Sequence, residues 1–128
     1  MKTHDKGMIG ELAVRKSLLE MGYSVFLPEV DNEQIDLIIE QDNGQFRRIQ
    51  VKTVLTQKTS TSIEVNMLKY KNTGRVDVVA IYYAPKNIIA YVPYENQHSI
   101  NLALTTGKNN QKKGRKWFYQ YERFPEFS

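Results

Sequence analysis

Apolar and polar residues alternate along two neighbouring segments, residues 35–40 and 49–52. A two-residue period places alternate side chains on opposite faces of a β-strand. Residues 42–45 separate the segments and read Asp-Asn-Gly-Gln, and Asn-Gly is a strong signal for a hairpin turn. The pattern therefore predicts two strands that pair as a hairpin, the second running from about Phe46 to Val54.

Three polar side chains fall on this predicted hairpin. Pairing brings Asp36 beside Gln50 and Lys52, and these last two, being two residues apart, face out together. An acid, an amide and an ammonium group are then predicted to share one small patch. This grouping is unusual for a sheet with a purely structural role.

A helix is predicted before the hairpin, from about Asp5 to Met21. Thr3 or Asp5 is its expected N-cap, and Gly22 stands where a left-handed C-terminal cap is expected. Gly7 and Gly10 each weaken the helix by about 1 kcal/mol relative to Ala, which suggests close approach to another backbone. The predicted apolar stripe comprises Met8, Leu12, Arg15 and Leu19, extended by Val14, Leu18 and Met21.

The remaining pattern predicts further strands and a basic tail. Residues 76–83 form a nearly continuous apolar strand, typical of the middle of a sheet, and residues 88–92 return as its hairpin partner. Shorter strands are expected at 23–28 and 62–65, while residues 94–106 are compatible with either a strand or a helix. The end of the chain is expected to hold a mobile basic loop at 107–116 and an aromatic segment, 117–121, that packs over the core rather than stacking on bases.

This order of elements favours an α/β (α+β) fold with a mixed sheet. The length of 128 residues suits a single domain over residues 1–128. The absence of cysteine excludes disulfides and thiolate metal sites. Because no apolar run is long enough to span a membrane and the first residues lack the apolar part of a signal peptide, a cytoplasmic protein with no membrane partner is expected.

The charge is distributed unevenly. Residues 1–42 carry four Lys or Arg against nine Asp or Glu, whereas residues 43–128 carry fourteen against five. A basic half favours a polyanionic partner, usually nucleic acid; the alternative is an ordinary solvated surface.

The predicted patch has the groups needed for phosphodiester hydrolysis. Asp36 offers a carboxylate and Gln50 an amide oxygen, both suitable ligands for Mg²⁺. Lys52 adds a cation near the phosphate or the attacking water. The alternative is a surface salt bridge between Asp36 and Lys52.

The order and spacing of these residues resemble the PD-(D/E)XK nuclease superfamily. That pattern has an acid at the start of one strand and (Asp/Glu)-X-Lys on the next, and here it meets Asp36 and Gln50-Val51-Lys52. The segment from Lys6 to Glu11 matches the first-helix motif, whose glutamate joins the metal site. Within the superfamily the chain is most similar to the small homing endonucleases of group I introns, with Holliday junction resolvases a close second.

The resemblance implies a restriction-endonuclease-like αβββαβ core with a mixed central sheet flanked by helices. It also implies a Mg²⁺-dependent endodeoxyribonuclease, with Mn²⁺ as a substitute, acting on double-stranded or branched DNA as a homodimer or homotetramer. The implied catalytic residues are Glu11, Asp36, Gln50 and Lys52, and the implied metal site comprises Glu11, Asp36, Gln50 and Val51.

One residue departs from the superfamily pattern. Gln50 replaces the usual second acid and brings no negative charge, so Glu11 is expected to supply the second carboxylate. The alternative functions are a junction resolvase or another structure-specific nuclease, and a DNA-binding module that has lost catalysis. The residues expected to contact DNA are Lys58, Lys69, Lys71, Lys108, Lys112, Lys113, Arg115 and Lys116.

Overall fold

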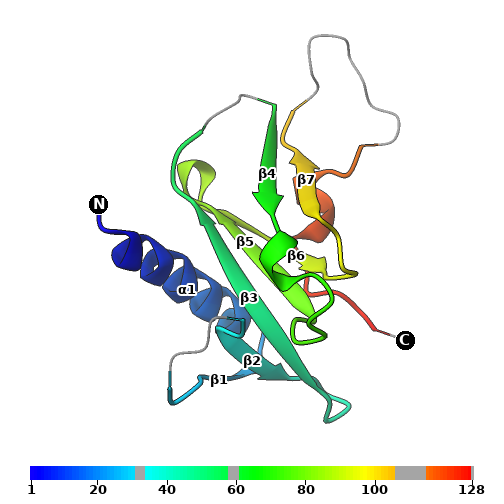
Figure 1. Ribbon diagram of the computed structural model, residues 1–128. Helices are drawn as coiled ribbons and strands as arrows, with labels where there is room; N and C mark the ends of the chain where they lie inside the picture. The colour runs from blue at the N-terminus through cyan, green and yellow to red at the C-terminus, as the bar shows by residue number, and fades with distance from the viewer. Residues whose placement is uncertain (31–33, 58–60, 106–114, 128) are drawn as a thin grey trace.

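A five-stranded mixed sheet lies at the centre of the structure (Figure 1). The computed structural model describes residues 1–30, 34–57, 61–105 and 115–127. The strand order is β1-β2-β3-β5-β6; β3 and β5 are parallel and the other neighbours are antiparallel. The strands are β1 (Ser24–Phe26), β2 (Leu37–Glu40), β3 (Phe46–Val54), β5 (Val78–Tyr83) and β6 (Ile88–Pro93).

The predicted central hairpin is confirmed. Strand β2 pairs with β3 in a register that sets Leu37 opposite Ile49. The turn includes Gly44 at a φ of +84°, a conformation that glycine adopts without strain. The hairpin of β5 and β6 is also as predicted, and β5 is buried on both faces, as its apolar run indicated.

The helix α1 (Thr3–Glu20) covers one face of the sheet. Val14 and Leu18 are fully buried there, in a cluster with the apolar residues of β2 and β3. Gly10 is the third buried residue of the helix, one turn before Val14. Spacings of four residues place all three on one stripe of the helix.

Two expectations about this helix are wrong. The predicted apolar stripe is wrong in its main part, because Met8, Leu12 and Leu19 point away from the sheet with exposed fractions of 39%, 52% and 60%, whereas its extension, Val14 and Leu18, does face the sheet. The N-cap is Lys2, which makes no side-chain capping bond, so neither Thr3 nor Asp5 takes that place. The left-handed Gly22 after the helix, with a φ of +93°, matches the expected C-terminal cap.

The opposite face is covered by a two-stranded antiparallel sheet made of β4 (Ser62–Asn66) and β7 (Ser99–Ala103). The open alternative between a strand and a helix in residues 94–106 is decided, within the part that the structure describes, in favour of a strand at Ser99–Ala103. The crossover from β3 to β5 consists of β4 and the 3-10 turn η1 (Leu68–Tyr70). The mixed central sheet and the leading helix that were expected are therefore present. In the described ranges, however, this small sheet takes the place of the second flanking helix that was expected.

The aromatic segment near the C-terminus packs over the core, as expected. It forms the 3-10 turn η3 (Phe118–Tyr121), whose first residue is buried in the cluster under β4 and β7. A further turn at Ala84–Lys86, η2, joins β5 to β6. Most of the predicted basic loop lies outside the described residues.

Candidate active site

Asp36 is fixed at the point where the chain enters β2. Its backbone N–H donates to the carbonyl of Ile49 at 2.9 Å, and its Oδ2 accepts a bond from the N–H of Val51 at 2.8 Å. Pairing of β2 with β3 ends at Leu37 and Ile49. The Asp36 carboxylate therefore binds the backbone of β3 just beyond the last paired residues. The predicted neighbourhood of Asp36 and β3 is confirmed.

Glu11 meets Asp36 from the helix. The pKa of Asp36 is raised from 3.8 to about 6, first by burial and then by the charge of Glu11 and a hydrogen bond with it. The Val51 N–H and the charge of Lys52 act in the opposite direction. An acid with a raised pKa beside another acid is a common sign of a functional site, because like charges held together need a cation or a proton.

The helix reaches this position because residue 10 is glycine. A Cβ at Gly10 would collide with the side chain of Thr53 on β3, and its closest contact would be the Oγ1 atom. The expected close approach is thus confirmed at Gly10, although the helix meets a side chain and not a backbone, and it is wrong for Gly7, where a Cβ would meet nothing within 4 Å among the described residues. Thr53 has the packing role that is ordinary for a strand threonine. Glu11 follows the contact directly, so this packing sets its distance from Asp36.

Gln50 lies on the face of β3 that carries Lys52, but it is buried, with an exposed fraction of 6%. The expectation that it faces out is wrong, because β4 and β7 cover this face of the sheet. Its Nε2 donates a long bond of 3.4 Å to the carbonyl of Val51. Its Oε1 is buried and has no hydrogen-bond partner among the described residues.

Lys52 is half-buried two residues farther along β3. Burial lowers the pKa of its ammonium group; Asp36 opposes this effect and the nearby Lys69 adds to it. The Nζ atom stands 4.7 Å from the centre of the Tyr70 ring, a cation–π contact. Tyr70, on η1, is a site residue that the sequence pattern did not indicate, since its contact depends on the crossover between β3 and β5.

The donors at this site fit a hard divalent cation. The described residues contain no group of three or more His, Cys, Asp or Glu placed to hold a metal ion. The oxygen donors are instead two carboxylates, the Gln50 amide and the Val51 carbonyl. The unpartnered Oε1 of Gln50 and the raised pKa of Asp36 are both conditions that a cation would relieve. Oxygen ligands with room for waters are what Mg²⁺ prefers.

A family model described as PD-(D/E)XK endonuclease matches residues 1–124 of the chain. The chain belongs to the PD-(D/E)XK endonuclease family. Protein 5.3 of Escherichia phage T7 is 34% identical to it over 72 residues, which are 56% of this chain and 59% of that protein. The match therefore leaves about two fifths of that relative uncovered.

The fold of this PD-(D/E)XK family member is similar to that of a bacterial homing endonuclease, I-Ssp6803I. The TM-score is 0.67 at 23% identity, over 94% of this chain and 86% of that chain. The mixed sheet and the leading helix thus agree with the fold that the sequence resemblance implied.

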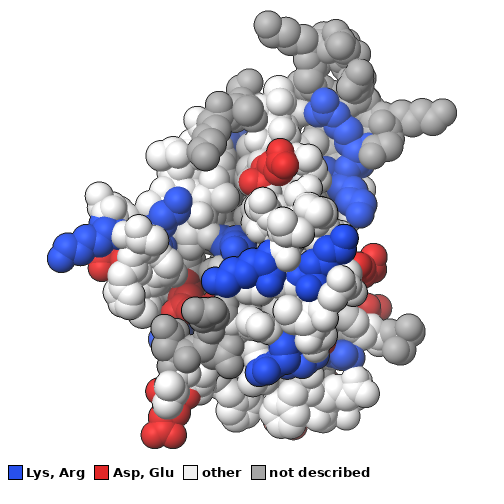
Figure 2. Space-filling view, in the orientation of Figure 1, with Lys and Arg blue, Asp and Glu red and all other residues white. Residues whose placement is uncertain are grey.

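The basic residues expected at a DNA surface are partly described. Lys69 and Lys71 are exposed on and after η1, and Figure 2 shows Lys and Arg side chains in a band over this part of the molecule. Arg115 and Lys116 lie against β7, where the Lys116 carbonyl accepts a bond from the N–H of Ala103. The other four, Lys58, Lys108, Lys112 and Lys113, lie outside the described residues. No helix in the described ranges is long and apolar enough to cross a membrane.

Proposed function

We propose that this member of the PD-(D/E)XK endonuclease family is a Mg²⁺-dependent DNA endonuclease that hydrolyses phosphodiester bonds. The observation that carries the proposal is the meeting of Glu11 and Asp36 at a half-buried position. Burial raises the pKa of Asp36 to about 6, with the charge of Glu11 and its hydrogen bond acting in the same direction. Two further observations support the proposal: Lys52 is half-buried near Asp36, and the Oε1 of Gln50 has no hydrogen-bond partner among the described residues. A structural ion pair between Asp36 and Lys52 would explain neither the second carboxylate nor the orphaned amide oxygen.

Each side chain has a distinct task in this proposal. Glu11, Asp36, Gln50 and the Val51 carbonyl would hold the ion, and Mg²⁺ when bound supplies charge stabilisation and a more acidic water. The Val51 N–H keeps Asp36 in place from the protein side. Lys52, kept from full hydration by burial, faces the phosphate and the attacking water.

Gln50 makes the charge balance depend on Glu11. With an acid at position 50, two carboxylates would come from the hairpin alone. Here the hairpin supplies only Asp36, and the second negative charge must come from α1. The position of the helix is therefore part of the site and not only of the core.

We also propose that the enzyme acts as a homodimer or homotetramer, in the manner of a homing endonuclease. A single site cuts a single strand, so a double-strand break requires two copies. The apolar side chains that α1 leaves exposed, Met8, Leu12 and Leu19, support self-association through this helix. Light scattering at micromolar concentration should show at least a dimer; a monomer with and without DNA would contradict a double-strand cutter.

Incubation with supercoiled plasmid, linear duplex and a four-way junction tests the activity. Cleavage is expected with Mg²⁺ and not with EDTA, and the preferred substrate separates homing-type cleavage from junction resolution. Asp36→Ala and Lys52→Ala should abolish cleavage while DNA binding is largely kept, with the exposed Lys86→Ala as control. Cleavage by Lys52→Ala at the wild-type rate would refute the mechanism. If the wild type binds DNA but does not cleave it, the protein is a DNA-binding module that has lost catalysis.

A further inference from the structure

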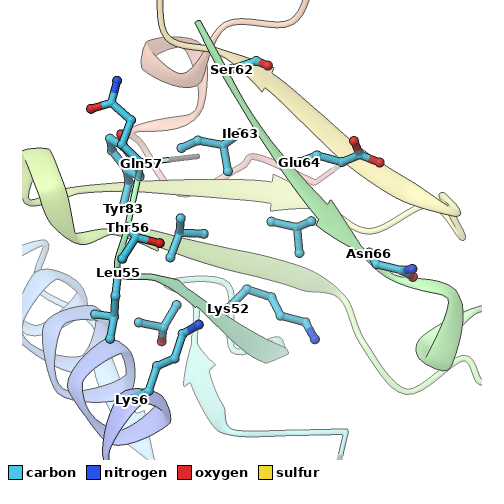
Figure 3. A pocket seen from close by; sticks show the side chains of 13 residues that line it. Lys6, Lys52, Leu55, Thr56, Gln57, Ser62, Ile63, Glu64, Asn66 and Tyr83 are labelled. Carbon is cyan, nitrogen blue, oxygen red and sulfur yellow. The ribbon is translucent and has the colours of Figure 1, made fainter. Parts of the chain in front are cut away.

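A pocket with a volume of about 610 Å³ opens beside the reaction centre. Lys52 is one of its lining residues, so the pocket is continuous with the place proposed for the phosphate. The end of β3 and the following residues 55–57 form one wall, and β4 forms the other. Figure 3 shows the side chains of β4 across from those of β3.

The two sides of the pocket differ in chemistry. Lys6, from the first turns of α1, and Lys52 place two cations on the same side (Figure 3). Apolar side chains of β3 and β4, including Val54, Ile63 and Val65, line the interior. Polar side chains such as Thr56 and Asn66 stand around them, and β4 also contributes one carboxylate, that of Glu64. Cations beside an apolar interior suit a ligand that has a phosphate at one end and a flat, largely apolar group at the other.

The size of the pocket argues against a regular duplex as its occupant. Its volume lies within the range of about 300–1,000 Å³ that is common for small-molecule sites. In a duplex the bases are stacked, so a protein reaches their groove edges, the sugars and the phosphates but cannot enclose a whole base. A nucleotide enters such a pocket only when it leaves the stack, and this requires the least energy where the base is unpaired.

We propose that this pocket binds an unpaired nucleotide adjoining the phosphate that is cut, with Lys6 contacting its phosphate. The proposal rests on the proposed nuclease function and gives that function a substrate class, DNA with an extrahelical or branched nucleotide at the cleavage point. Lys6 is then a binding residue, on the same helix as Glu11 but with a separate task. The Tyr83 hydroxyl, which is buried at the pocket wall with no partner among the described residues, is a hydrogen-bonding group still available to this ligand.

The test compares two labelled 30-mer duplexes, one fully paired and one with a single extrahelical thymidine, by fluorescence anisotropy in EDTA. The wild type is expected to bind the bulged duplex at least about tenfold more tightly, because pairing and stacking need not be broken. Thr56→Trp, which fills the pocket from an exposed position, should bring the ratio of the two dissociation constants to about one. Lys6→Ala should lower the affinity for the bulged duplex more than that for the paired one.

Matched controls separate the pocket from general effects. Ser24→Trp adds the same side chain at an exposed position of β1, and Lys16→Ala removes an exposed lysine from α1; neither residue lines the pocket. Both should keep the wild-type ratio. Circular dichroism establishes folding, and Lys6→Ala decides the result if Thr56→Trp does not fold.

The outcomes for the pocket and for catalysis are distinct because binding in EDTA requires no cleavage. A wild-type ratio near one, or a ratio that Lys6→Ala and a folded Thr56→Trp leave unchanged, would overturn the pocket proposal even if Mg²⁺-dependent cleavage is observed. A preference for the bulge that the pocket variants lose would support it, even if cleavage is absent and the proposed function fails.

Discussion

The substitution Gly10→Ala, which adds a single methyl group, tests whether close packing of α1 on β3 positions the residues of the site. An alanine Cβ there would lie 3.0 Å from Thr53 Cβ and 3.3 Å from Thr53 Cγ2, with Oγ1 still closer. Rotation of the threonine cannot clear all three atoms, because its Cβ belongs to the strand position itself. Gly10→Ala must therefore push α1 away from β3 or distort the strand.

Gly7→Ala provides the matched control. Gly7 is in the same helix, and a Cβ there would meet nothing within 4 Å among the residues that the structure describes. Both substitutions gain about 1 kcal/mol of helix propensity, so this gain cancels in their comparison. Overpacking costs about 1–3 kcal/mol, and this is the expected difference between the two unfolding free energies. Gly7→Ala should stabilise the protein, and Gly10→Ala should be neutral to about 2 kcal/mol less stable than the wild type.

Urea unfolding followed by circular dichroism measures the difference, and Thr53→Ala supplies the rescue. That change removes Oγ1 and Cγ2, so the double variant Gly10→Ala/Thr53→Ala should recover part of the loss in a thermodynamic cycle. Mg²⁺-dependent cleavage by Gly10→Ala should fall as well, since the contact positions Glu11. Equal stabilisation by the two glycine substitutions would refute the close approach and the route by which Glu11 reaches Asp36.

Three further outcomes are expected. The pKa of Asp36 rises on folding from 3.8 to about 6, so the metal-free folded protein holds this proton more tightly than the unfolded chain. Its stability should therefore fall as pH rises across that interval. Urea unfolding in EDTA at several pH values should show this decrease, and Asp36→Asn should remove it. Gln50→Glu should preserve some cleavage in Mg²⁺ whereas Glu11→Gln should be more damaging, and equal tolerance of both in a single-turnover assay would remove Glu11 from the site. Replacement of Lys69 and Lys71 by Gln should flatten the dependence of log K on log[salt] by about 0.9 for each phosphate that the protein no longer neutralises; an unchanged slope in anisotropy titrations would show that these lysines do not bind DNA.

The strands were predictable where one local signal was sufficient. The central hairpin has a two-residue apolar period on both arms and an Asn-Gly turn between them, so its pairing followed without knowledge of the rest of the chain. The apolar run of residues 76–83 indicated burial on both faces, and β5 is indeed covered by α1 on one side and by the small sheet on the other. The covering by β4 and β7 was not predictable, since these strands are distant in sequence and each is short.

The face of α1 was predicted only in part, for a physical reason: Val14 and Leu18 face the sheet as the pattern indicated, but Met8, Leu12 and Leu19 do not. The stripe of Met8, Leu12 and Leu19 has large apolar side chains at helical spacing, and the rule that such stripes face the core selects it. The stripe that does face the sheet begins with Gly10, which contributes almost no apolar surface. The close packing of the helix on the Thr53 side chain requires the smallest residue at position 10, and the glycine itself was the signal for that contact.

The burial of Gln50 connects the fold to the chemistry. Alternation along β3 correctly placed it on the face of Lys52, but exposure depends on what covers the face, and alternation carries no information about that. Burying an amide oxygen without a partner costs about 1–3 kcal/mol, so a leucine of similar size would serve a purely structural strand better. A member of the family that had lost both the acid at position 50 and its activity would be expected to have an apolar residue there, because no metal ion would then need an oxygen ligand. The presence of Gln50 beside Glu11 and Asp36 is consistent with a working site in which the missing charge comes from the helix and the amide oxygen is completed by the bound ion.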